Sequence, residues 1–287
     1  MEEWVRADAA PVRARSEVPS RPPAKVPPLP ADVAAEIRRA ADTATARHRE
    51  ALVGRMEKAV AAYERGRYPE ALRYSNELTR EVGSVPAVRR LAGLAAYRLG
   101  RWRDAARHLQ AFAQLADEPE VTPALMDSLR ALGRHAQVTA EWTELRHRSP
   151  DADVLSEARI VAAGSLADRG RLSEAIELLA SAGAARALRN PSDRHLRQWY
   201  ALGDLYERAG DLPRARELFL RVARVDPEAY DVADRLDALG QGGPPRRRRR
   251  SRPASTASRP ASAAPPASAR SSEPAPSCPD RGGEGSK

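Results

Sequence analysis

The stretch WYALGDLYERAGDLPRARELFLRVARVDP, from Trp199 to Pro227, decides the fold of this chain. Large and small residues alternate in it at helical spacing, and the pattern breaks near Gly210. In such a pattern, bulky side chains of one helix enter the gaps that glycine and alanine leave on the facing helix. The stretch therefore predicts two antiparallel helices that pack closely.

The same stretch resembles a tetratricopeptide repeat (TPR), a helix–turn–helix unit of about 34 residues. Seven positions agree with the family pattern, and Val222 departs from it because the family usually has a small residue there. The agreeing residues are Trp199, Leu202, Gly203, Tyr206, Ala215, Phe219 and Pro227. The resemblance implies an all-α fold, a right-handed TPR-like α-solenoid. Because nearly all basic residues are arginine, the chain also resembles TPR proteins of high-GC bacteria.

Five glycines mark the turns of successive repeats and are spaced 34, 33, 37 and 40 residues apart. They are Gly66, Gly100, Gly133, Gly170 and Gly210. Glycine suits a helix C-terminus because it has no Cβ to clash in the left-handed conformation. Five residues after each glycine comes a small packing residue, replaced by valine in the third repeat. These residues are Ala71, Ala105, Val138, Ala175 and Ala215. About five helical hairpins are therefore expected over 55–227, and the widest spacing predicts an insertion at 181–193.

Both ends of the repeat array are expected to carry a capping helix, because stacked repeats need polar outer faces. At the N-terminal end we expect one helix over about 32–53, within a capping region 31–54 that begins near Asp32. At the C-terminal end, 228–240 is expected to form a helix in which Tyr230 takes part and which Gly240 ends.

Residues 1–30 form a Pro-rich leader that contains PPAKVPPLP, from Pro22 to Pro30. Proline-rich segments favour the polyproline II conformation, and their composition favours a disordered leader. The alternative interpretation is a ligand for an aromatic-lined groove. Trp4 is the one residue that suggests a docking anchor, and the sequence does not indicate its partner.

Residues 241–287 form a tail without aromatic residues, which is expected to be disordered because it cannot bury enough apolar surface. Of the chain's net charge of +9, the tail contributes ten basic and three acidic side chains, or +7. The arginine cluster is expected to attract polyanions, giving weak, non-specific RNA or DNA binding. It consists of Arg246, Arg247, Arg248, Arg249, Arg250 and Arg252.

No pattern typical of catalysis, of a metal site or of a cofactor site is found in the sequence. Cys278 is the one cysteine, the five histidines are scattered, and neither HExxH nor GxSxG occurs. We therefore expect no enzyme activity and no cofactor. The N-terminus lacks a secretory signal and no apolar run is long enough for a membrane span, so a cytoplasmic protein without a membrane partner is expected.

The resemblance places the first helix of each repeat along a concave groove, so outward positions on those helices are the candidate contacts. They are Tyr63, Arg90, Leu94, Tyr97, Arg98, Asp127, Arg130, Tyr200 and Asp204, with Met56 and Glu207 sharing the same face. Tyrosine and arginine often contribute most to interface energy. A partner segment with apolar and acidic residues would fit this lining.

Two functions remain open on the sequence. The first is a non-enzymatic scaffold that binds a protein or peptide segment in the groove. The alternative is a nucleic-acid- or ribosome-associated protein that uses its Arg-rich tail. The oligomeric state is not predicted.

Overall fold

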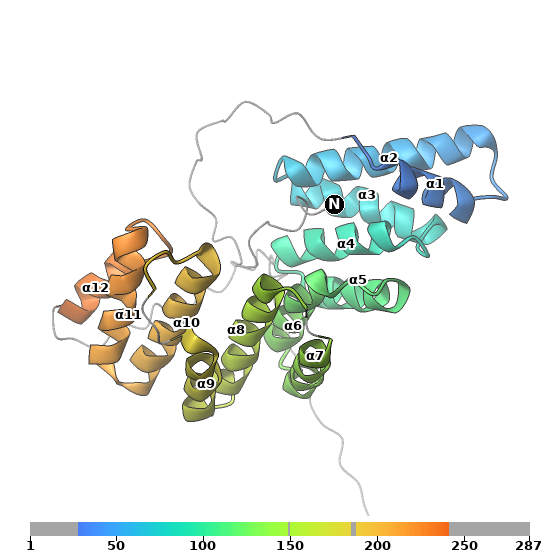
Figure 1. Ribbon diagram of the computed structural model, residues 1–287. Helices are drawn as coiled ribbons and strands as arrows, with labels where there is room; N and C mark the ends of the chain where they lie inside the picture. The colour runs from blue at the N-terminus through green and yellow to red at the C-terminus, as the bar shows by residue number, and fades with distance from the viewer. Residues whose placement is uncertain (1–27, 149, 185–187, 241–287) are drawn as a thin grey trace, which may run out of the picture. The chain divides into compact units, whose positions relative to one another are not determined.

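The computed structural model describes residues 28–148, 150–184 and 188–240. Within these ranges the regular elements are helices, and no strand is present (Figure 1). The twelve α-helices are α1 (Ala31–Ala40), α2 (Ala46–Glu64), α3 (Tyr68–Glu81), α4 (Pro86–Arg98), α5 (Trp102–Leu115), α6 (Thr122–Ala131), α7 (His135–His147), α8 (Ala152–Asp168), α9 (Leu172–Leu179), α10 (Asp193–Ala209), α11 (Leu212–Val225) and α12 (Val232–Gly240). Two short helical turns, η2 (Pro119–Val121) and η3 (Ala180–Ala184), join neighbours.

Five helical hairpins account for α2 to α11, and each first helix packs against the helix that follows it. The pairs are α2 with α3, α4 with α5, α6 with α7, α8 with α9, and α10 with α11. Helix α1 packs on α2 and helix α12 on α11, so each end of the array carries one further helix (Figure 1). The all-α solenoid of about five hairpins predicted from the sequence is confirmed.

The five turn glycines all have the left-handed backbone that the sequence predicted. Their φ angles are 72° at Gly66, 67° at Gly100, 72° at Gly133, 79° at Gly170 and 84° at Gly210. In every turn, the residue after the glycine donates its backbone N–H to the carbonyl five residues earlier, as in a Schellman motif. These bonds join Arg67 to Ala62 (2.8 Å), Arg101 to Ala96 (2.9 Å), Arg134 to Leu129 (2.9 Å), Arg171 to Leu166 (3.0 Å) and Asp211 to Tyr206 (2.9 Å).

Small residues allow the helices of a hairpin to approach closely. A Cβ placed on Gly203 would lie 2.8 Å from Cε1 of Phe219, and one on Gly93 would lie 2.5 Å from Cδ2 of Leu109. The same contact therefore recurs in the second and fifth hairpins. The packing residues expected after the turns are buried as well: Ala71, Ala105, Ala175 and Ala215 are fully buried, and Val138 is nearly so.

The single N-terminal helix expected over 32–53 is wrong, because two helices, α1 and α2, replace it. The break follows from Thr45, whose side-chain oxygen accepts a hydrogen bond from the backbone N–H of His48 at 3.3 Å. Threonine is favoured at a helix N-cap, where its side chain accepts a hydrogen bond from a free backbone N–H, and is less favourable inside a helix. Helix α2 therefore begins at Ala46 and runs without interruption into the first hairpin.

The last helix also begins later than expected, at Val232, and Tyr230 lies in the turn before it. Tyr230 has a left-handed φ of 57°. The carboxylate of Asp226 accepts the backbone N–H of Glu228 at 3.0 Å, which favours a turn over a helix at this point. The ring of Tyr230 packs on the ring of Tyr200, with their centroids 4.5 Å apart.

In the fourth hairpin, where the widest spacing predicted an insertion, α9 ends at Leu179 and η3 follows it. Gly183 has a φ of 85° and ends this helical segment. Residues 188–192 then lead to α10, which begins at Asp193.

Candidate functional site

The first helices of the five hairpins form one row, since α2 contacts α4, α4 contacts α6, α6 contacts α8 and α8 contacts α10. All nine predicted contact residues lie on this row, on α2 (Tyr63), α4 (Arg90, Leu94, Tyr97, Arg98), α6 (Asp127, Arg130) and α10 (Tyr200, Asp204). They separate into two groups: five belong to a polar network, and three line an apolar groove. The ninth, Arg98, does not line the groove itself but interacts with the Tyr63 hydroxyl and lies over the ring of Tyr68.

The polar network begins on α4 and crosses α6 to α8. The hydroxyl of Tyr97 donates to Oδ2 of Asp127 at 3.0 Å. Arg130 lies 3.6 Å from Oδ1 of Asp127, and its Nε donates to Oδ2 of Asp168 at 2.7 Å. Burial raises the pKa of the Asp127 carboxyl, while Arg130 opposes that rise. The guanidinium thus bridges two carboxylates from different hairpins.

Gly164 on α8 makes room for this bridge. A Cβ at that position would lie 2.6 Å from both Cζ and Nη1 of Arg130. Any larger residue would therefore force the guanidinium away from its place between the helices. Arg130 can therefore lie between the helices only because residue 164 has no side chain.

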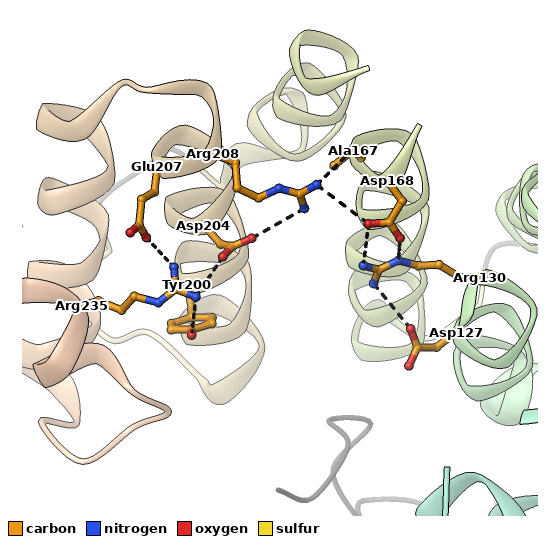
Figure 2. A network of polar contacts seen from close by, with 9 residues as sticks. All are labelled: Asp127, Arg130, Ala167, Asp168, Tyr200, Asp204, Glu207, Arg208 and Arg235. Atoms are coloured by element: carbon orange, nitrogen blue, oxygen red, sulfur yellow. Dashed lines mark hydrogen bonds and ion pairs between the residues drawn. The ribbon is translucent and has the colours of Figure 1, made fainter. Parts of the chain in front are cut away.

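The network continues from α8 through α10 to α12, as Figure 2 shows. The guanidinium of Arg208 donates to the carbonyl of Ala167 at 3.1 Å and lies 3.9 Å from the carboxylates of both Asp168 and Asp204. Arg235 then pairs with Asp204 at 3.0 Å and also with Glu207.

Tyr200 joins the end of this network. Its hydroxyl donates to the carboxylate of Asp231 and accepts a hydrogen bond from Arg235 at 3.4 Å. Burial raises the pKa of this hydroxyl, and the hydrogen bond to Asp231 adds to the rise. Arg235 also lies over the rings of Tyr200 and Phe219, so the charge is held against the core of the fifth hairpin.

Several residues predicted to contact a partner are instead buried within the chain. Tyr97 is only 3% exposed and belongs to the core, and Met56 and Glu207 are buried too. We expected the rings and charges of this face to be open to a partner, and for Tyr97 that expectation is wrong. Its ring packs edge-on against Trp102, and its hydroxyl is taken by a neighbouring hairpin.

The apolar groove lies at the other end of the row, between α1, α2, α4 and the end of α5. It has a volume of about 470 Å³. Three predicted residues line it, Tyr63, Leu94 and Arg90, and apolar side chains form most of the remaining wall. These are Leu29, Pro30, Val33, Met56, Val60, Pro86, Leu91, Phe112 and Leu115. Leu115 is 43% exposed, so its side chain adds accessible apolar area to this wall.

The charges of the apolar groove lie at its edge. Arg90 donates to Oε2 of Glu118 at 3.0 Å, and its side chain is 17% exposed. Asp32, Glu36 and Arg39 of α1 also belong to the lining. The arginine that was expected to bind an acidic partner is therefore paired within the chain.

Sequence reasoning missed α1 as a wall of the groove and missed Asp168, Arg208 and Arg235 as members of the network. Gly164 is a signal in the sequence that could have pointed to the network, because a glycine inside a helix and away from any turn suggests a close contact there. Which side chain fills the space above it depends on a neighbouring hairpin, and that is not visible in local sequence.

The histidines do not form a reactive site in the described residues. His48 contacts Glu81, His135 contacts Ser165, and His195 caps α10 with Ser192. His108 is buried in α5. No group of three or more metal-binding side chains occurs in the described ranges. None of the helices that can be assessed is both long and apolar enough to cross a membrane.

Two predicted segments lie outside the described residues: the leader up to residue 27, which includes Trp4, and the tail. The polyanion-binding arginines of the tail, from Arg246 to Arg252, therefore stay a prediction.

Comparison with known proteins gives the following similarities. A family model described as tetratricopeptide repeat matches residues 35–86 and 160–230. Among solved structures, a thermophilic TPR protein of Thermus thermophilus is similar, with a TM-score of 0.52 and 18% sequence identity. The match covers 66% of this chain and 99% of that one, and at this identity it supports the fold alone. Comparison with curated proteins gives no match.

Proposed function

We propose that this chain, which is similar to tetratricopeptide-repeat proteins over residues 35–86 and 160–230 and shares their fold, is a non-enzymatic scaffold that binds a segment of a partner protein in the apolar groove. Proteins of this fold generally serve as protein-interaction scaffolds, which supports the coarser part of the proposal. The observation that carries the finer part is the groove itself, about 470 Å³ of largely apolar space beside an exposed leucine.

The polar network and the apolar groove differ as binding surfaces. Each charged side chain drawn in Figure 2 already has a partner of opposite charge, so a ligand there would have to replace existing ion pairs. The groove instead offers apolar area that a partner would remove from water, at roughly 25 cal/mol per Å². This contrast favours an apolar partner segment over the mixed apolar and acidic one expected from sequence. We place this binding in the cytoplasm.

The test uses a display library of random peptides selected on the full-length protein. Peptides enriched on the wild type should bind Leu115→Glu at least about tenfold more weakly, because a buried leucine contributes about 1.5–3 kcal/mol. Val225→Glu is the matched control, since Val225 is 48% exposed on α11 and lies outside the groove. Peptides that bind both variants equally well would place the interaction elsewhere and contradict the proposal.

A further inference from the structure

The apolar groove lies beside the point where the described chain begins. Leu29 and Pro30 form part of its lining. Leu29 also packs, half-buried, against the core cluster that α1 shares with α2 and α4. The Pro-rich leader is therefore attached at the wall of the groove, with no linker between them.

The backbone at this point has the geometry of polyproline II. Pro30 has a φ of −53° and a ψ of 137°, an extended backbone near the values of that conformation. Val26, Pro27 and Leu29 each precede a proline, which restricts them to extended or polyproline II geometry. Such a segment loses little conformational entropy when it docks in this form.

We propose that the segment 22–27 of this chain occupies the apolar groove in polyproline II form and competes there with a partner segment. The competition rests on the proposed function, whereas the occupancy does not. Polyproline II has three residues per turn and a rise of about 3.1 Å per residue, so residue 26 lies about 9 Å from Leu29 on the same face. In the proposed docked form, Val26 would therefore share the face of Leu29.

The groove suits this occupant chemically. The half-buried Tyr63 provides a ring surface of the kind that proline-rich segments pack against, and Leu115 provides exposed apolar area. Because the segment is tethered without a linker, its effective concentration at the groove is on the order of millimolar or more. Weak contacts are therefore sufficient to keep it bound.

Disulfide trapping in the full chain tests the occupancy. In a Cys278→Ser background, Val26→Cys is combined with Leu115→Cys, a position whose exposure makes the change tolerable. The matched control combines Lys25→Cys with Leu115→Cys, which keeps the tether nearly identical but turns the thiol to another face. Disulfides form only when the two Cα atoms lie within about 7 Å, so the reaction reports the face as well as the proximity.

We expect an intrachain disulfide that forms about tenfold faster for the Val26 pair than for the Lys25 pair, since only the former faces the groove. Equal rates, or no disulfide, would overturn the proposed docking. Disulfide-linked dimers in place of monomers would also overturn it, because the occupant would then be a second copy.

A second measurement separates this inference from the proposed function. Replacing Pro22, Pro23, Pro27 and Pro28 by serine should increase the affinity of the selected peptides about tenfold, because the tethered competitor is weakened. Unchanged peptide affinity would overturn the competition. If the disulfide forms and no peptide can be selected, the proposed function fails and the occupancy stands.

Discussion

A single missing Cβ sets the distance between the two helices of the fifth hairpin. Gly203 faces Phe219, and a Cβ there would lie 2.8 Å from the ring. Gly203→Ala should therefore lower the free energy of unfolding by about 1–3 kcal/mol, although alanine is the better helix former. Urea unfolding of the full chain measures this change.

Gly54 is the matched control for Gly203. It also lies inside a helix, α2, but no atom lies within 4 Å of where its Cβ would be. Gly54→Ala should leave stability unchanged or raise it by up to about 1 kcal/mol. If both substitutions change the free energy of unfolding by the same amount, close packing at Gly203 does not contribute to stability as proposed.

His108 is a buried histidine whose titration links stability to pH. It is 1% exposed, and burial lowers its pKa to about 4, with Arg107 and Arg89 contributing. In the unfolded chain its pKa is about 6.5. The unfolded state thus binds more protons between these values, and stability falls as pH decreases from about 6.5 to about 4, by at most roughly 3 kcal/mol.

The variant His108→Leu should flatten this part of the stability profile, because it removes the group that the unfolded state protonates. Chemical unfolding at several pH values between 4 and 7 measures the slope. His147→Leu, at an exposed position on α7, serves as the control and should keep the wild-type slope. A slope that persists in His108→Leu would assign the pH dependence to other groups.

At the scale of elements, ion pairs tie the first helices of successive hairpins together. Arg130 of α6 reaches Asp168 of α8, and Arg208 of α10 reaches back to the last turn of α8. The buried apolar clusters also run across neighbouring hairpins, and these ion pairs add polar contacts between the same helices. In stacked repeats, such nearest-neighbour terms decide whether the array unfolds as one unit.

Arg130→Gln should therefore destabilise the array by about 1–3 kcal/mol, because it leaves the half-buried Asp127 without its cation and Asp168 with only the more distant Arg208. The control is Arg214→Gln, whose salt bridge to Asp211 is exposed and local. That change should stay within about 0.5 kcal/mol. Urea unfolding followed by circular dichroism compares the two, and equal losses would mean that the bridge contributes nothing between hairpins.

The inner faces of the hairpins differ along the row. In the first two, Met56, Val60 and Leu94 give an apolar wall, whereas Asp127, Arg130 and Asp204 occupy the later faces. The helix α1 then lies beside the apolar part alone. The row of first helices therefore has the apolar groove at one end. At the other end it has a polar surface whose charges are paired.

At the scale of the whole molecule, charge is unevenly distributed. Residues 1–30 carry five basic and four acidic side chains (+1) and the tail carries +7, so 9 − 7 − 1 leaves +1 for residues 31–240. The positive charge that a polyanion would meet is therefore concentrated in the tail. We keep the prediction that this tail binds single-stranded RNA weakly and without sequence preference.

Replacing Arg246–Arg250 and Arg252 by glutamine in the full chain should abolish this binding, because it removes the cations that displace counterions from RNA. For the wild type, the log–log slope of affinity against salt should be roughly −4 if six arginines each meet a phosphate. Fluorescence anisotropy with a labelled oligonucleotide measures both. RNA binding that survives the replacement would belong to the repeats instead.

The sequence by itself determined the hairpins, their number and their turns. The conformation at Gly66 or Gly210 depends on residues within one turn of helix, so the spacing of glycines was sufficient to find it. The burial of Ala71 and Ala215 followed from the same spacing, since it fixes which side of a helix faces its partner. These are local properties, and the chain encodes them locally.

Only the tertiary structure decided which predicted contact residues are accessible. Tyr97 is buried because its hydroxyl meets Asp127, 30 residues later in the chain, and Arg130 is held by Asp168, 38 residues later. The apolar groove likewise exists because α1, α2, α4 and the end of α5 all contribute side chains to it. Side chains far apart in sequence compete for the same space and the same charges, and the packing of whole helices settles that competition.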